Sequence, residues 1–285
     1  MKKLLSYAVV SLLVLVLAAC GTSNEGGESG TGSNIEEGKL VIGASNVPHS
    51  EVLEEAKALL EEKGIELEIK TFTDYILPNQ TLRDGDIDAN YFQHEPYLKS
   101  QIAENNYDFV SAGGVHIEPI GVYSQKYDSL EELPEGAQIL MSNSVADHGR
   151  ILAMLEEKGL ITLKEGVETT SATIDDIEDN PKDLQFNTQF DAAFLPQAYL
   201  NGDGDAVLIN GNYALGAEID PEEEAIALES GENNPYVNLI VVREEDKDNE
   251  QIKALVEVLQ SDEIKAFIEE KYKGSVLPAK AADEE

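Results

Sequence analysis

The chain has 285 residues, with 56 acidic and 20 basic side chains, a formal net charge of −36 and a single cysteine, Cys20. This charge argues against nucleic acid or an anionic lipid surface as a direct partner, because both would be repelled. One cysteine excludes an internal disulfide and a metal site made of several thiolates. The length suffices for one large domain or for two lobes.

The first residues predict an export signal. Two lysines precede an apolar run, residues 4–19, which is shorter than the roughly 20 residues that span a bilayer. The small residues before Cys20 resemble the lipobox of bacterial lipoproteins. This resemblance implies that residues 1–19 are a signal peptide and that Cys20 carries acyl chains, which anchor the chain to the cell membrane on its extracytoplasmic face.

The segment after the cysteine predicts a flexible tether. Residues 21–38 consist of Gly, Ser, Thr, Asn and Glu with one apolar residue, Ile35. Such a composition cannot bury enough surface to order itself. We therefore expect the lipidated cysteine and its tether to occupy residues 20–38.

Strand and helix patterns alternate from residue 39 onward. Lys39–Gly43 is an apolar run, Glu51–Lys63 has an amphipathic helical pattern that ends at Gly64, and Ile65–Ile69 alternates as a second strand. This order predicts a βαβ unit with parallel strands and, with the later elements, an α/β fold. The later elements are strands at 138–141, 206–209 and 239–242, a helix at 150–158, and two helices within 251–272.

Polar and aromatic residues follow several of these strands. Ligands of open α/β proteins bind where the C-terminal ends of parallel strands meet. We expect 71–80 and 88–97 to be loops, and their aromatic residues beside His94 fit an apolar pocket with a few polar groups. Core packing is the alternative for each aromatic residue taken alone.

Three further polar residues are candidates for the same pocket. Arg150, at the expected start of a helix, can bind a carboxylate through its guanidinium group. The alternative interpretation is that Arg150 forms an ion pair on the surface. Asn210 and Asn238 flank predicted strands, where an amide can bond to an ammonium or carboxylate group. Each asparagine alone can also be a turn residue.

Several segments, in order along nearly the whole mature chain, resemble the methionine-binding lipoprotein family of ABC uptake systems. They are Phe72–Asn79, Asp88–His94, Gly113–Gly121, Ile209–Leu215, Pro235–Arg243 and Tyr272–Gly274. The resemblance implies a two-lobed, periplasmic-binding-protein-like fold with the ligand in the cleft between the lobes. Residues 39–120 with 238–285 would form one lobe, and 121–237 the other.

The same resemblance implies a site with an apolar slot for a thioether and a polar end for an amino-acid head group. Its residues would be Tyr75, Phe92 and Tyr97 around the thioether, His94, Arg150 at the carboxylate, and Asn210 and Asn238 as orienting amides. The implied protein is a monomer without cofactor or catalysis that delivers its small-molecule ligand, an amino acid or dipeptide, to an ABC permease and its ATPase.

The segment before Arg150 departs from the family pattern. Where the family has Pro-Asn-Asp-Pro-Thr-Asn before Gly-Arg, this chain has Ser142–Asp147, so that the carboxyl group of Asp147 replaces an amide. Gln197 also stands in place of an expected arginine. A new negative charge near the ligand head favours an extra ammonium group or disfavours a carboxylate. This departure suggests the hypothesis that the preferred ligand is not free L-methionine but D-methionine, a methionine-containing dipeptide or another apolar amino acid.

A metal-binding lipoprotein of an ABC importer is the main alternative. The chain has four histidines but neither a histidine-rich loop nor a pair at ligand spacing on one helix. His116 and Glu118 alternate on an expected strand, where we predict a structural pair rather than metal ligands.

An enzyme and a purely structural surface lipoprotein are the remaining alternatives. Ser142, Ser144, Asp147 and His148 contain the residue types of a hydrolase, but the chain has no Gly-x-Ser-x-Gly elbow and no phosphate-binding glycine loop. We therefore expect a binding protein without catalysis.

Overall fold

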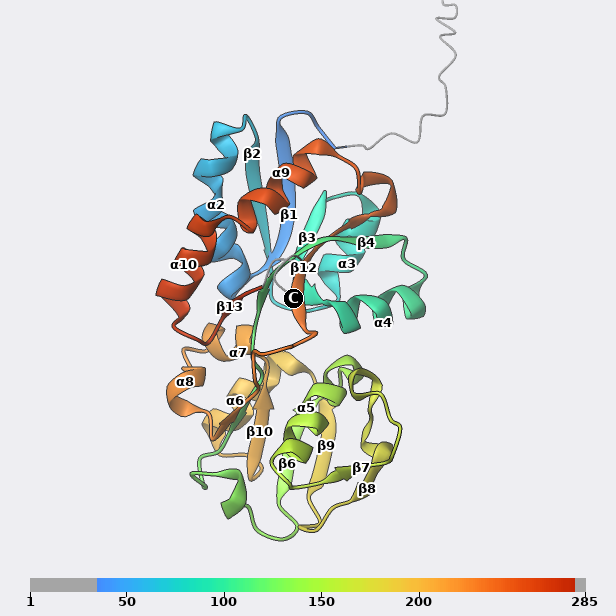
Figure 1. Cartoon of the computed structure of the whole chain (residues 1–285), viewed down its shortest axis with the longest axis vertical. Coiled ribbons are helices and arrows are strands. Elements are labelled where there is room, and N and C mark those ends of the chain that lie inside the picture. The colour runs from blue at the N-terminus through green and yellow to red at the C-terminus, as the bar shows by residue number, and fades with distance from the viewer. Residues whose placement is uncertain (1–34, 280–285) are drawn as a thin grey trace, which may run out of the picture. The chain divides into compact units, whose positions relative to one another are not determined.

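A computed structural model of the chain describes residues 35–279 (Figure 1). The predicted signal peptide, Cys20 and most of the predicted tether lie outside these residues. The predicted βαβ unit is confirmed, because β1 (Lys39–Ser45) pairs in parallel with β2 (Glu66–Phe72) and α2 (Glu51–Glu62) joins them.

The first sheet takes its strands from both ends of the described chain, in the order β13-β4-β12-β3-β1-β2. β12 enters it antiparallel to β3 and β4, although it lies far from both in sequence. The remaining strands of this sheet are β3 (Ala89–His94), β4 (Phe109–Ile117), β12 (Val237–Arg243) and β13 (Leu277–Pro278).

Both faces of the first sheet are covered by helices. Ile240 and Val242 of β12 join the core cluster that contains the apolar sides of α2, α9 and α10. Leu239 and Val241 point to the other face and pack with residues of α3 and α4. This two-residue alternation buries one strand on both sides. These helices are α3 (Leu77–Asp84), α4 (Glu95–Asn105), α9 (Glu250–Leu259) and α10 (Asp262–Tyr272).

The second sheet, drawn in the lower half of Figure 1, has the order β11-β5-β10-β6-β9. Ile139 and Met141 of β6 pack against α5, and Leu140 packs on the other face with α6 and α7. Its strands are β5 (Gly121–Tyr123), β6 (Gln138–Ser142), β9 (Gln185–Phe190), β10 (Ala206–Ile209) and β11 (Ala227–Leu228). Its helices are α5 (Val145–Glu157), α6 (Leu195–Asn201), α7 (Gly211–Gly216) and α8 (Pro221–Glu224).

Short elements complete the described chain. A two-stranded sheet pairs β7 (Thr162–Leu163) with β8 (Ile177–Asp179) beside α5. Single helical turns occupy Asn46–Ser50, Leu130–Glu132, Thr169–Ser171, Ile174–Asp176, Ala192–Phe194 and Glu244–Asp246.

Two segments connect the sheets. The chain leaves the first sheet after β4, passes through residues 118–120 and enters the second sheet at β5. It returns through residues 229–236, between β11 and β12. The polar residues Glu118 and Asn238 therefore stand where the chain crosses from one sheet to the other.

The prediction that 71–80 and 88–97 are loops is wrong for most of their length. Every residue of β3 is buried, and α3 and α4 begin within the two segments. The polar residues that suggested loops satisfy one another: Asn79 donates to Gln93 at 3.1 Å, and Asn90 and Gln93 donate to Asn79 at 2.9 and 2.8 Å. A buried strand can hold these amides because each finds a partner.

The predicted start of the helix at Arg150 is also wrong. α5 begins at Val145, so Arg150 lies in its second turn and does not meet the N-terminal end of the helix dipole. The sequence hid the first turn because Gly149 interrupts the helical pattern and is a weak helix former. The other predicted strands and helices are confirmed, with ends that differ by a few residues.

Candidate functional site

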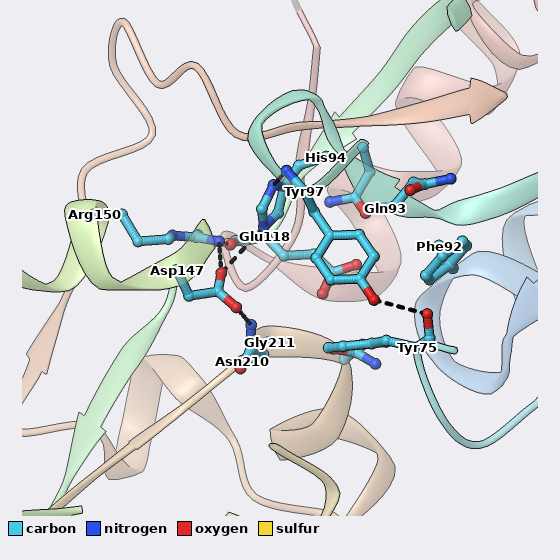
Figure 2. Close-up of a pocket in the computed structure, with 12 residues that line it drawn as sticks. Tyr75, Phe92, Gln93, His94, Tyr97, Glu118, Asp147, Arg150, Asn210 and Gly211 are labelled. Atoms are coloured by element: carbon cyan, nitrogen blue, oxygen red, sulfur yellow. Dashed lines mark hydrogen bonds and ion pairs between the residues drawn. The ribbon is translucent and has the colours of Figure 1, made fainter. Parts of the chain in front are cut away.

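One pocket brings together all eight predicted ligand-binding residues (Figure 2). They come from both sheets and their helices. Tyr75 follows β2, Phe92 and His94 lie in β3, Tyr97 lies in the first turn of α4, Asp147 and Arg150 lie in α5, Asn210 precedes α7, and Asn238 lies in β12. The pocket is also lined by Gln93, Glu118, Gly211 and Asn212.

Aromatic side chains form one end of the pocket, on the right of Figure 2. The ring of Tyr75 lies 6.0 Å from the rings of both Phe92 and Tyr97, centre to centre, and 5.0 Å from the ring of Tyr213. The Tyr75 hydroxyl donates to Asn212 Oδ1 at 2.6 Å, and the Tyr97 hydroxyl donates to the Tyr75 carbonyl at 2.9 Å. These bonds fix the rings, which offer an apolar and polarizable surface.

Arg150 stands at the opposite, polar end of the pocket. Its Nε donates to the carboxylate of Glu229 at 3.1 and 3.2 Å, and its Nη2 donates to the same carboxylate and to the Glu118 carbonyl at 2.7 Å. Its Nη1 lies 3.6 Å from Asp147 Oδ1. Burial lowers the pKa of Arg150, but the charge and hydrogen bond of Glu229 outweigh burial and raise it. The ion pair is buried, so the predicted alternative of a surface salt bridge is wrong.

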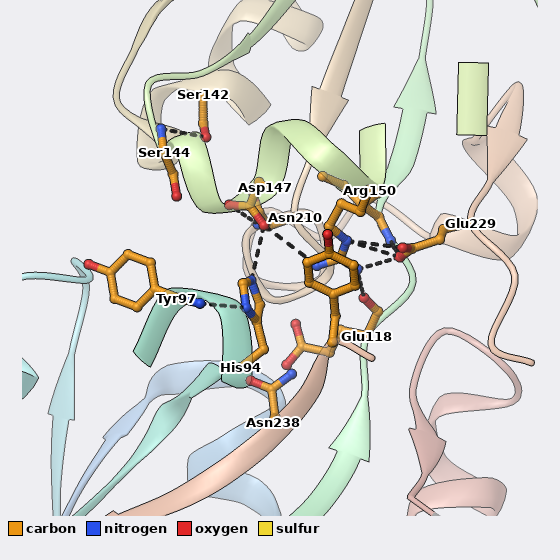
Figure 3. Close-up of polar contacts among 12 residues, drawn as sticks. His94, Tyr97, Glu118, Ser142, Ser144, Asp147, Arg150, Asn210, Glu229 and Asn238 are labelled. Atoms are coloured by element: carbon orange, nitrogen blue, oxygen red, sulfur yellow. Dashed lines mark hydrogen bonds and ion pairs between the residues drawn. The ribbon is translucent and has the colours of Figure 1, made fainter. Parts of the chain in front are cut away.

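Asp147 is held from three directions (Figure 3). Its Oδ1 lies 3.1 Å from His94 Nε2, and its Oδ2 accepts from Asn210 at 3.3 Å. The Tyr97 backbone N–H donates to His94 Nδ1 at 3.2 Å, so Nε2 is the ring nitrogen that donates to Asp147. Burial raises the pKa of Asp147, but the hydrogen bond from His94 and the charge of Arg150 outweigh it and lower the pKa to about 2.

Glu118 is the charged one of the four pocket residues that sequence reasoning missed. It was predicted as the structural partner of His116, and that pair is confirmed, because His116 Nε2 lies 2.8 Å from Glu118 Oε1. Glu118 nevertheless also lines the pocket. A Cβ atom at Gly211 would lie 2.9 Å from Glu118 Cβ, so glycine is needed there for α7 to approach it. The His-x-Glu spacing was the available signal.

A hydrogen-bonded cluster lies behind this carboxylate, and we call Tyr91, His116, Glu118, His49 and Asn238 the buried network. Tyr91 Oη bonds His116 Nδ1, and His49 Nε2 lies 3.0 Å from Asn238 Oδ1 and 3.3 Å from Glu118 Oε1. Burial lowers the pKa of His49 to about 4 and that of His116 to about 3. Both rings are therefore neutral hydrogen-bond donors near pH 7.

The buried network also contains the one trio, among residues 35–279, whose donor atoms could together hold a metal ion. The donor atoms of His49, His116 and Glu118 lie within 4.8 Å of one another. Both histidine Nε2 atoms already face hydrogen-bond acceptors. Glu118 therefore already has hydrogen-bond donors without an ion, while His49 Nδ1 is a buried atom without a hydrogen-bond partner among residues 35–279.

The residues considered for a hydrolase do not form a triad. His148 Nε2 bonds the backbone carbonyl of Ser142 at 3.0 Å, and Ser142 Oγ accepts from the Ser144 backbone N–H. Asp147 bonds His94 instead of His148. The arrangement orders the start of α5 and leaves neither serine next to a base.

The described residues include no helix that is long and apolar enough to cross a bilayer. The predicted lipidation site, Cys20, lies outside them.

Comparisons with known proteins find relatives over nearly the whole chain. The family model described as NlpA lipoprotein matches residues 40–280. The methionine-binding lipoprotein MetQ of Bacillus subtilis is 50% identical over 279 residues, which cover 98% of this chain and 99% of that protein.

Solved structures extend the comparison to the fold. A nutrient binding protein from Burkholderia cenocepacia bound to methionine matches with a TM-score of 0.79 and 43% identity, covering 85% of this chain and 100% of that one. An ABC transporter periplasmic substrate-binding protein from Coxiella burnetii matches with a TM-score of 0.79 and 38% identity, covering 84% and 100%. This chain therefore has the two-lobed fold of periplasmic substrate-binding proteins and belongs to the NlpA lipoprotein family.

Proposed function

We propose that this protein is a lipid-anchored, extracytoplasmic solute-binding protein that binds methionine or a close relative and delivers it to an ABC importer. The observation that carries the proposal is the single pocket with an aromatic end at Tyr75, Phe92 and Tyr97 and a charged end at Arg150. An apolar slot opposite a guanidinium matches an amino acid with a long apolar side chain. The relatives whose descriptions name methionine support the same ligand.

The ligand's carboxylate would meet the guanidinium of Arg150 at Nη1, the nitrogen that faces Asp147 rather than Glu229. Asn210 Oδ1, a buried atom without a hydrogen-bond partner among residues 35–279, is available to a ligand donor. Asp147 already has partners inside the protein, the hydrogen bond with His94 and the nearby guanidinium of Arg150. For this reason the carboxylate that replaces the family's amide does not by itself call for a second ammonium group.

The remaining parts of the proposal concern the rest of the chain. We assign residues 39–120 and 238–285 to one ligand-binding lobe and residues 121–237 to the other. The strands of each sheet support this division, except that β12 begins one residue earlier, at Val237. Residues 1–19 are removed on export, and Cys20 carries the lipid. The protein acts as a monomer with a permease and an ATPase, and it catalyses no reaction.

The test is to identify the bound ligand. The mature lipoprotein is purified in detergent, and the small molecule that accompanies it is identified by mass spectrometry. Calorimetry then compares L-methionine, D-methionine, Gly-Met, leucine and zinc chloride. We expect one of the methionine compounds to bind most tightly. Stoichiometric zinc together with no amino-acid binding would support a metal carrier instead and refute the proposal.

A further inference from the structure

Glu118 is a buried carboxylate whose side chain no cation of the pocket contacts. It follows β4, where the chain leaves the first sheet, and its side chain is only 7% exposed. Arg150, the one arginine or lysine among the residues that line the pocket, donates to the Glu118 backbone carbonyl. Figure 3 shows Glu118 between Asn238 and Arg150.

The groups that do contact the carboxylate are neutral donors. His116 Nε2 lies at 2.8 Å, His49 Nε2 at 3.3 Å, and the backbone N–H of Asn212 bonds to it as well. His116 Nδ1 is bonded to the Tyr91 hydroxyl, which leaves the ring proton on the Nε2 that faces Glu118. The buried network therefore orients the carboxylate without neutralising it.

The charges at this end of the pocket do not balance. The guanidinium of Arg150 is matched by Glu229 and approached by Asp147, so Glu118 adds a further negative charge with no positive partner. Leaving a buried charge without a partner is costly. Burial accordingly raises the pKa of Glu118, and the opposing effects of His49, the Asn212 backbone N–H and Arg150 only partly offset this. An ammonium group brought by the ligand would give the Glu118 carboxylate the cationic partner that it lacks inside the protein.

We propose that Glu118, oriented by His116 and His49, is the residue that binds the ligand's α-ammonium group, while Arg150 receives the α-carboxylate. This inference rests on the proposed function, because it assumes an amino-acid ligand. Asp147 is the competing acceptor, but its two oxygens already face His94, Asn210 and Arg150. Glu118 is a carboxylate without such a cation, which makes it the stronger partner for an ammonium.

The test compares methionine with 4-(methylthio)butanoate, which has the same carboxylate and thioether but no amine. Calorimetry measures both ligands on the wild-type protein, on Glu118→Gln and on Asp147→Asn. A charge-assisted hydrogen bond contributes enough that Glu118→Gln should weaken methionine binding roughly 10- to 100-fold. The same change should alter binding of the amine-free analogue less than about threefold, because no ammonium is lost there.

The controls separate the possible outcomes. Asp147→Asn should affect the two ligands alike, since Asp147 acts through Arg150 and His94. Tyr91→Phe is the second variant in case Glu118→Gln unfolds. This substitution removes the hydroxyl that fixes the His116 tautomer. It should weaken the binding of methionine severalfold and leave the binding of the analogue nearly unchanged. Glu55→Gln, on the exposed side of α2, should change neither.

Four results would overturn the inference. Equal weakening of both ligands by Glu118→Gln would show a merely structural role, and no weakening of either would remove the role entirely. A loss that is selective for methionine in Asp147→Asn and absent in Glu118→Gln would assign the ammonium to Asp147. If the wild-type protein binds no amino acid at all, the proposed function fails, and the inference fails with it.

Discussion

Gly149 is the position in α5 where a single methyl group should do the most damage. A Cβ atom there would lie 2.1 Å from the backbone carbonyl oxygen of Thr169 and 3.1 Å from the carbonyl carbon of Thr170. Both neighbours are backbone atoms, so no side chain can rotate away. In Gly149→Ala, α5 or the Thr169–Ser171 turn must therefore shift by about 1 Å to restore an ordinary van der Waals contact.

The cost can be estimated from the two opposing effects. Overpacking of this kind typically costs about 1–3 kcal/mol, while alanine regains up to about 1 kcal/mol of helix propensity. We expect a net loss of about 1–2 kcal/mol, which for a domain of this size lowers the melting temperature by about 2–8 °C. Because Gly149 adjoins Arg150, the shift also moves the guanidinium, and methionine affinity should fall by roughly tenfold or more.

Differential scanning calorimetry and titration calorimetry check both parts of this prediction. Gly216→Ala is the matched control, because Gly216 ends α7, is exposed and has nothing within 4 Å of the added methyl group. That variant should keep wild-type affinity and be as stable or up to about 1 kcal/mol more stable. If Gly149→Ala melts at or above the wild-type temperature, the close packing of α5 on the turn is refuted.

Three further predictions concern the polar end of the pocket. Arg150→Met leaves Glu229 buried without its cation, so this variant should lose about 3–5 kcal/mol of stability and at least 100-fold in methionine affinity. The exposed control Arg83→Met should change neither quantity. Denaturant unfolding measures the stability, and calorimetry measures the affinity. Asp147 has a pKa lowered from 3.8 to about 2, so its charge adds about 2 kcal/mol of stability above pH 3.8 that is lost as the pH falls toward 2. Asp147→Asn should therefore be less stable than wild type at pH 6, and a constant difference down to pH 2 would contradict the assignment. EDTA treatment should leave the melting temperature and methionine affinity unchanged, because both histidine Nε2 atoms of the buried network already face hydrogen-bond acceptors. A drop on chelation would establish a structural metal.

The sequence predicted the fold where local pattern and burial agree. The apolar run at the start of β1, the amphipathic stripe of α2 and the alternation in β2 predicted a parallel βαβ unit, and the structure contains it. The prediction failed where the buried side chains are polar. β3 looked like a loop because its Asn90 and Gln93 find their partners across the chain on Asn79, and no pattern within one segment reveals such a partner.

The candidate site shows the same division. The residue types predicted an aromatic slot and a charged end, and the eight residues do line one pocket. The partner of Arg150 could not be predicted, because Glu229 is 79 positions away. Glu118 was set aside as half of a structural pair, since the sequence does not show that this pair also borders the pocket and contacts His49.

The position of Glu118 has a mechanical consequence. Arg150 from α5 donates a hydrogen bond to the main-chain carbonyl of Glu118. His116 from β4 and His49 from the turn after β1 contact its side-chain carboxylate. The two sheets cannot swing apart about the 118–120 connection without stretching at least one of these attachments. A fluorine label at residue 119 or 120 would therefore report on this connection. Its signal should change when the two sheets move apart and the ligand is released, as a single event.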